Sequence, residues 1–121
     1  MPIEPEPISG YTTTTGEFTE PSVIHKWAEA SGVVATTTAT IITIASGTTK
    51  VRGFAGSGNG DGYFFIEVDG VKKYAFTTSV IAPNVAYIFP QPENLVGEIK
   101  LKVTNISTGT SAYSGAVFLG G

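Results

Sequence analysis

Few residues of this chain have the types and the spacing that catalysis or metal binding requires. His25 is the only histidine and the chain contains no cysteine, so a site of histidines and thiolates, or a Ser-His-Asp triad, would depend on this one side chain. Asn59 and Asp61 are spaced like ligands of a calcium loop, but no bidentate glutamate follows where such a loop needs one. We therefore expect a protein that is not an enzyme and that binds no metal and no other cofactor.

A glycine-rich run, GFAGSGNGDG at 53–62, is the next candidate for chemistry. Glycine-rich loops bind phosphate when they lead into the N-terminus of a helix, because free backbone N–H groups point at the anion there. The residues that follow here, YFFIEV, are typical of a strand instead. The run therefore predicts a flexible segment before a hairpin, with a tight turn at Asn59-Gly60, and no nucleotide site.

The aromatic residues on both sides of Asp69-Gly70 are the strongest functional feature of the sequence. Asp-Gly between two strand-like segments predicts a type I′ turn, because both central residues of that turn need positive φ. A two-residue turn pairs Val68 with Val71 and fixes all pairs farther from it, and successive side chains alternate between the faces of the sheet. Both faces are then apolar: one carries Phe64, Ile66, Val68, Val71 and Ala75, and the other carries Tyr63, Phe65, Tyr74 and Phe76.

The second of these faces needs a cover, because a sandwich strand normally shows one face to the core and the other to water. Three alternatives for what covers this face stay open. They are the chain's own strands and N-terminal segment, another protein, or a glycan whose sugar rings stack on the aromatic side chains. Three further aromatic residues could extend such a surface, namely Trp27, Tyr87 and Phe89.

The composition indicates a single all-β domain. The chain has 121 residues, of which only 14% are charged against a typical value of about 25%, and it is rich in threonine, glycine, β-branched and aromatic residues. Seven lysine and arginine residues and a net charge of −3 form no basic stripe, so we expect no nucleic-acid partner. No stretch approaches the roughly 20 apolar residues of a membrane span, and no signal sequence is evident, which predicts synthesis in the cytoplasm without a membrane partner.

Residues 1–21 are predicted to form an extended N-terminal arm, followed by a β-sandwich domain at 22–121. Pro2, Pro5 and Pro7 favour polyproline II geometry. Four side chains could anchor the arm to a neighbour, namely Ile3, Ile8, Tyr11 and Phe18. The alternative is a flexible terminus.

The remaining elements predict an antiparallel jelly-roll-like sandwich of about eight strands. Residues 23–31 fit a helix or a strand, and the β-like sequence around them favours a strand. Turn residues recur every 8–12 positions, and 98–104 alternates cleanly between apolar and polar residues. An immunoglobulin-like sandwich is the second choice, since the Cys and Trp residues that mark it are not in place.

Four segments of this pattern, TTTATIITIASGTTKVRGF, GDGYFFIEVDGVKKY, ENLVGEIKLKVTN and TSAYSGAVFLGG, resemble small jelly-roll virion structural proteins of tailed bacteriophages. The resemblance covers residues 33–121 and is to capsid decoration (cement) proteins or related fibre and baseplate modules. It implies a non-enzymatic homotrimer that binds the major capsid protein or another virion protein, is assembled in the host cytoplasm and resides in the virion. The alternative is a carbohydrate-binding or host-recognition module of a tail fibre or baseplate, with a glycan as partner.

Overall fold

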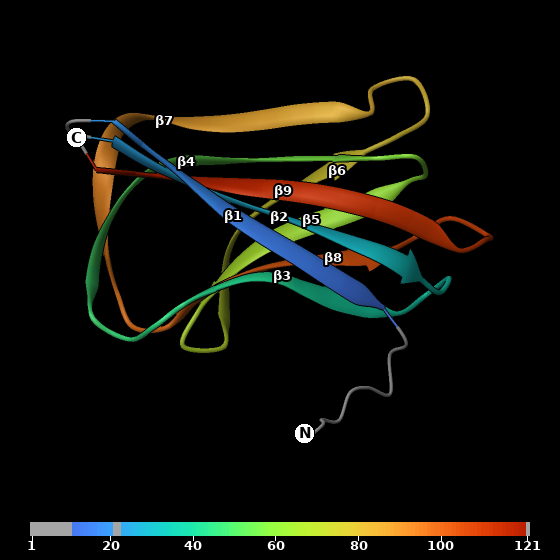
Figure 1. The fold of residues 1–121 in the computed structure, drawn as a ribbon, viewed down its shortest axis with the longest axis horizontal. Coiled ribbons are helices and arrows are strands. Elements are labelled where there is room, and N and C mark those ends of the chain that lie inside the picture. The colour runs from blue at the N-terminus through green and yellow to red at the C-terminus, as the bar shows by residue number, and fades with distance from the viewer. Residues whose placement is uncertain (1–10, 21–22, 121) are drawn as a thin grey trace.

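Nine antiparallel strands form two sheets in the computed structural model, which describes residues 11–20 and 23–120, without the side chains of 18–20 and 23–25. The strands are β1 (Thr12–Glu20), β2 (Val23–Val33), β3 (Thr38–Ile44), β4 (Thr48–Gly58), β5 (Gly62–Val68), β6 (Val71–Thr78), β7 (Asn84–Val96), β8 (Ile99–Asn105) and β9 (Ser111–Gly120). One sheet has the order β1-β2-β9-β4-β7 and the other β3-β8-β5-β6, and the two lie face to face (Figure 1). The expected all-β sandwich is confirmed.

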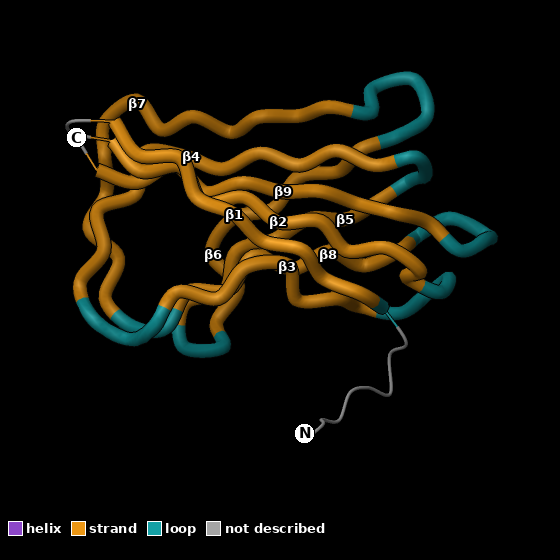
Figure 2. Tube along the Cα trace, in the orientation of Figure 1, coloured by secondary structure: helices purple, strands orange, loops and turns teal. Residues whose placement is uncertain are grey.

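The strand order is that of a jelly roll with one strand added. From β2 to β9 the chain passes between the sheets at every connection except the β5–β6 hairpin, and this gives four strands in each sheet. The connections gather at the two ends of the sandwich (Figure 2). β1 extends the larger sheet beside β2.

Within the described residues, the larger sheet begins at Thr12, inside the range 1–21 that is predicted as an arm. β1 pairs with β2 along its whole length, from Thr12 opposite Ser31 to Glu20 opposite Val23. Its threonines have high β-propensity, and pairing satisfies backbone groups that an arm would leave to water. The same pairing confirms that residues 23–31 are a strand.

The four predicted anchors of the arm have different outcomes. Tyr11 packs against the core, and its hydroxyl oxygen accepts a hydrogen bond from the backbone N–H of Thr40 at 3.3 Å. Tyr11 therefore docks on its own chain. Ile3 and Ile8 lie outside the described residues, as does the side chain of Phe18.

The hairpin turn is confirmed, but the predicted register holds only for the two pairs next to it. Asp69 and Gly70 have φ values of 51° and 80°, as a type I′ turn requires. Beyond Glu67 opposite Lys72 the register shifts by one residue, because Lys73 is an extra residue on β6. Such a bulge turns every later side chain to the other face.

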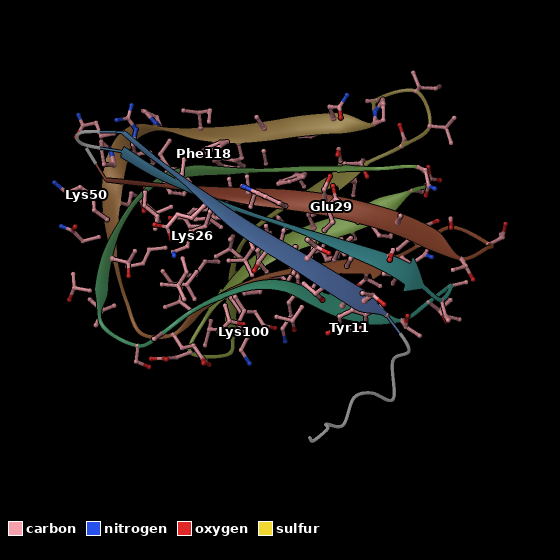
Figure 3. All side chains as sticks on the ribbon, in the orientation of Figure 1. Tyr11, Lys26, Glu29, Lys50, Lys100 and Phe118 are labelled. Carbon is pink, nitrogen blue, oxygen red and sulfur yellow. The ribbon has the colours of Figure 1, made fainter. Side chains whose placement is uncertain are left out.

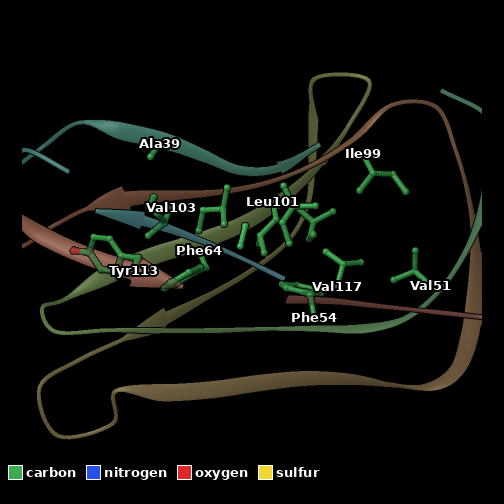
Figure 4. Packing of buried hydrophobic residues seen from close by; sticks show 14 of the residues in the cluster. Ala39, Val51, Phe54, Phe64, Ile99, Leu101, Val103, Tyr113 and Val117 are labelled. Atoms are coloured by element: carbon green, nitrogen blue, oxygen red, sulfur yellow. The ribbon is translucent and has the colours of Figure 1, made fainter. Parts of the chain in front are cut away.

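The bulge directs two of the predicted surface aromatics into the sandwich. Tyr74 lies opposite Ile66 and Phe76 opposite Phe64, both on the face that meets the larger sheet. Phe76 stacks on the Phe64 ring at 5.2 Å between centroids and lies against the Phe54 ring at 5.3 Å, tilted by 30°. Figure 4 shows Phe54 and Phe64 among the buried side chains between the sheets. The chain's own strands therefore cover this part of the aromatic face.

The glycine-rich run is mostly strand, which corrects the predicted flexible segment. β4 continues to Gly58, with a bulge at Arg52. A Cβ at Gly56 would stand 2.6 Å from the Phe64 ring, and one at Gly58 would overlap the ring of Tyr113. These glycines are needed because core aromatic rings lie directly on the strand.

β7 continues past Pro90 to Val96. The segment from Phe89 to Pro92 makes no pair with β4, since Val51 lies opposite Glu93 and Gly53 opposite Ile88. The two prolines of this segment lack the N–H that a ladder needs, and an edge strand tolerates them.

Candidate functional site

The outer face of the smaller sheet keeps only two of the four predicted interface aromatics of the hairpin. The ammonium of Lys72 lies 4.6 Å from the ring centroids of both Tyr63 and Phe65, and it donates a hydrogen bond to the Tyr63 hydroxyl at 3.1 Å. Phe65 is only 7% exposed. Nearby, Lys102 and Glu67 form an ion pair at 2.9 Å. The polar side chains of this surface therefore contact one another. Contact of this surface with another protein stays a prediction.

The inward-facing, partly buried half of the aromatic set links the edges of the two sheets. The ring of Tyr74 on β6 lies 4.9 Å from that of Phe89 on β7, and its hydroxyl donates a hydrogen bond to Glu93 at 2.5 Å. This bond to a carboxylate, together with burial, raises the pKa of Tyr74 to about 12. The Tyr74–Glu93 contact has a structural role, because it holds β6 and β7 together.

A groove of about 410 Å³ lies on the outer face of the larger sheet, across β2, β9, β4 and β7. Its floor is a row of residues that are paired from strand to strand: Trp27, Ala116, Ala55 and Ala86. Neighbouring strands are about 4.8 Å apart, so the row is about 14 Å long. The three alanines have no atom beyond Cβ, and a long open channel results beside the indole.

A polar row runs parallel to the floor, two residues farther along each strand and about 7 Å away. It consists of Glu29, Ser114, Ser57 and Asn84, again in register across the four strands. The hydroxyls of Ser57 and Ser114 are hydrogen-bonded to each other at 2.8 Å. Figure 3 labels Glu29 among the side chains of this sheet. The row offers hydrogen-bond donors and acceptors along one side of the groove.

Trp27 forms one end of the groove and is held there by its neighbour on β1. Gly16 lies directly opposite Trp27, and a Cβ at Gly16 would overlap atoms of both rings of the indole. The indole therefore takes the place of the side chain that Gly16 lacks, as cross-strand aromatics do over edge glycines. With 41% of its surface exposed, Trp27 still presents a large apolar area to solvent.

From the sequence, Trp27 is predicted only as a residue that could extend the aromatic surface of the hairpin. The other seven residues of the two rows are not predicted as site residues. The signal was the alternation of small residues in SAYSGAVF and FAGSG, which places alanine and serine on one face of β9 and of β4. Nothing in the sequence showed that these two segments are neighbours. The strand pairing supplies that link.

The described residues contain no group of three or more His, Cys, Asp or Glu side chains that could hold a metal ion. Within the same residues, no helix is long and apolar enough to cross a membrane. The side-chain oxygen of Asn59 accepts a hydrogen bond from the Ala112 backbone N–H at 3.0 Å, and the backbone carbonyl of Asp61 accepts one from the Tyr113 hydroxyl at 2.7 Å.

The solved structures that are similar to this chain in fold include two β-sandwich proteins. One is the CBM36-1 domain of a multidomain xylanase from the hindgut metagenome of Trinervitermes trinervoides, at 12% identity and a TM-score of 0.42, with 93% of this chain and 98% of that chain covered. The other is the Clostridium difficile EutQ protein, at 11% identity and a TM-score of 0.34, with 92% and 64% covered. No protein-family model matches the sequence. No curated protein matches it either.

These likenesses concern the β-sandwich fold alone. The fold and the site define the chain as a jelly-roll β-sandwich with a groove on the outer face of its larger sheet.

Proposed function

We propose that this chain is a non-catalytic carbohydrate-binding module that holds a glycan in the groove across β2, β9, β4 and β7. Jelly rolls serve as capsid domains and as lectins, so the fold leaves both expectations open and the site must distinguish them. The observation that supports the proposal is the joint placement of an exposed indole, a floor of alanines and a row of polar side chains.

The groove matches the two-sided chemistry of a sugar. The C–H groups of a sugar ring form apolar patches that pack on an aromatic ring and on methyl groups, while its hydroxyls both donate and accept hydrogen bonds. Trp27 and the alanines offer the first kind of contact. Ser57, Ser114 and Asn84 offer donors and acceptors of the second kind.

Other ligand classes fit the groove less well. Phosphate and nucleic acid need cationic side chains or a helix N-terminus, and the residues that line the groove include no lysine or arginine. A protein interface would need large apolar anchors, whereas three of the four floor residues are alanine.

A glycan microarray probed with three forms of the protein tests the proposal. An aromatic contact contributes about 0.5–1.5 kcal/mol beyond its buried area, so Trp27→Ala is expected to lower affinity by roughly tenfold. Tyr63→Ala is the matched control, because it removes an aromatic residue from the opposite sheet and should leave binding unchanged. The proposal fails if folded wild-type protein binds no glycan, or if Trp27→Ala binds as well as wild type.

A second variant distinguishes loss of binding from loss of structure, in case Trp27→Ala weakens the pairing of β1 with β2. Ala55→Leu fills the middle of the floor from the solvent side while every core contact is kept, so thermal unfolding should be near that of the wild type. Glycan binding should be blocked. Unimpaired binding by Ala55→Leu would place the ligand elsewhere.

Capsid decoration is the second candidate, and exposed aliphatic residues favour it. The loops β2–β3, β6–β7 and β8–β9 lie at one end of the sandwich (Figure 1). Their side chains are largely in solvent: Val34 49%, Val80 78%, Ile81 96% and Ile106 52%. Exposed apolar residues of this kind mark protein contacts. A homotrimer bound to the major capsid protein or to another virion protein could use this end.

Light scattering after size-exclusion chromatography tests the second candidate. The full chain is compared with a chain that lacks residues 1–10, because a longer deletion would remove β1. A trimer that dissociates in Val80→Asp would support this candidate. A monomer in both forms would contradict it.

A further inference from the structure

Glu29 is the only ionisable residue that lines the groove. Its carboxylate is exposed and forms no hydrogen bond or ion pair with any described residue. The nearest cation in sequence, Lys26, is paired with Glu17 of β1 at 2.7 Å and belongs to the alternate, inner side of β2. The carboxylate is therefore available to a ligand.

Cationic residues lie in both sheets but do not line the groove. Four of the seven lysine and arginine residues of the chain lie in β6 and β8 of the smaller sheet, namely Lys72, Lys73, Lys100 and Lys102, and the other three, Lys26, Lys50 and Arg52, lie in β2 and β4 outside the lining of the groove. The groove on the larger sheet has one carboxylate and no cation among its lining residues. An anion that enters the groove meets an uncompensated negative charge.

We propose that Glu29 determines the specificity of the groove by charge: it admits neutral glycans, favours those with a free amino group, and excludes acidic sugars. An ionised carboxylate only accepts hydrogen bonds, so it matches hydroxyl and ammonium donors. A uronate or sulfate group offers neither a donor nor an opposite charge. This inference rests on the proposed glycan function and adds to it the class of ligand.

The test compares wild type with Glu29→Gln on a microarray that holds neutral, amine-bearing and uronate or sulfated glycans. The wild type should bind acidic glycans roughly tenfold more weakly than neutral glycans of the same linkage, because like charges close together in a partly exposed site repel by an amount of that order. Glu29→Gln should bring both ratios, the affinity for acidic over neutral glycans and the affinity for amine-bearing over neutral glycans, close to one, whatever its effect on the affinity for neutral glycans. High salt should weaken the preference for amines in the wild type.

Glu98→Gln is the matched control, because it makes the same change in net charge outside the groove, in the connection before β8, where Glu98 pairs with Lys100. It should behave as the wild type. If the wild type binds neutral and acidic glycans equally, or if Glu29→Gln discriminates as the wild type does, the charge inference is wrong while the glycan function stands. If no class of glycan binds, the proposed function fails and this inference fails with it.

Discussion

The indole of Trp27 on β2 fills the space that a side chain at Gly16 on β1 would occupy. A glycine inside a strand normally weakens pairing, because it contributes no side chain to pack. Here the missing side chain allows the indole to rest on the edge strand. β1 therefore contributes to the groove although it lies outside the two rows.

Gly16→Ala should displace the indole and weaken glycan binding. The added Cβ would overlap both rings, so Trp27 must turn away. We expect a roughly tenfold loss of affinity, similar to the loss in Trp27→Ala. Because Trp27 is the only tryptophan, its fluorescence emission reports the movement directly.

Gly109→Ala is the control for this change, since a Cβ at Gly109 would meet no atom within 4 Å. It should leave both the emission and the affinity unchanged. An indole that keeps its emission in Gly16→Ala would contradict the contact with Gly16.

Phe76→Ala should destabilise the protein strongly, because the bulge at Lys73 turns this ring inward. Phe76 packs on Phe64 and Phe54, and removal of a core phenylalanine costs about 3–5 kcal/mol. Since Phe76 is only partly buried, we expect a value near the lower limit. Chemical denaturation measures the loss.

Val71→Ala, on the same strand, is the comparison for Phe76→Ala. Val71 is 60% exposed, so its truncation should change the free energy of unfolding by no more than about 0.5 kcal/mol. Equal, small effects of the two variants would contradict the bulge. They would support the unshifted register, in which Phe76 faces outward.

Tyr74 should titrate later than an ordinary tyrosine. Because its pKa is raised to about 12 in the folded protein, above the value of about 10 in the unfolded chain, its contribution to stability is complete below about pH 10 and is lost as the pH rises to about 12. Ultraviolet absorbance should show a late step near pH 12 that Tyr74→Phe removes. Burial also raises the pKa of Tyr113, so the comparison with this variant identifies the step of Tyr74.

Glu93→Gln separates the two causes of this raised pKa. The neutral amide removes the charged acceptor, so the late step should move toward lower pH, while burial keeps part of the shift. A late step at an unchanged pH in Glu93→Gln would show that the hydrogen bond is not the main cause.

The fold could be predicted from the sequence because its signals are local. The Asp69-Gly70 turn needs two residues that tolerate positive φ, and the alternation of Ile99, Leu101 and Val103 with polar residues marks a half-buried strand. The bulge at Lys73 has no such signal, since any residue can be the extra one on an edge strand. Because the sequence does not reveal this one extra residue, Tyr74 and Phe76 are both predicted on the outer face although they lie on the inner face.

The groove could not be predicted, because its residues become a site only through pairing between distant strands. Ala55 and Ala116 lie 61 positions apart (116 − 55) and are neighbours only because β4 pairs with β9. Small residues also give a weak signal by themselves. Gly56 and Gly58 were assigned to a loop for a similar reason, since the rings of Phe64 and Tyr113 that need their space come from other strands.

Mapping of a bound glycan by NMR tests the central claim most directly. The best glycan from the microarray is titrated into ¹⁵N-labelled protein, and the backbone amide shifts are followed. We expect saturable changes at Trp27, Glu29, Ser57 and Ser114, with none at Tyr63 or Phe65 on the opposite sheet. Changes confined to the β5–β6 hairpin, or none that saturate, would contradict a glycan site in the groove.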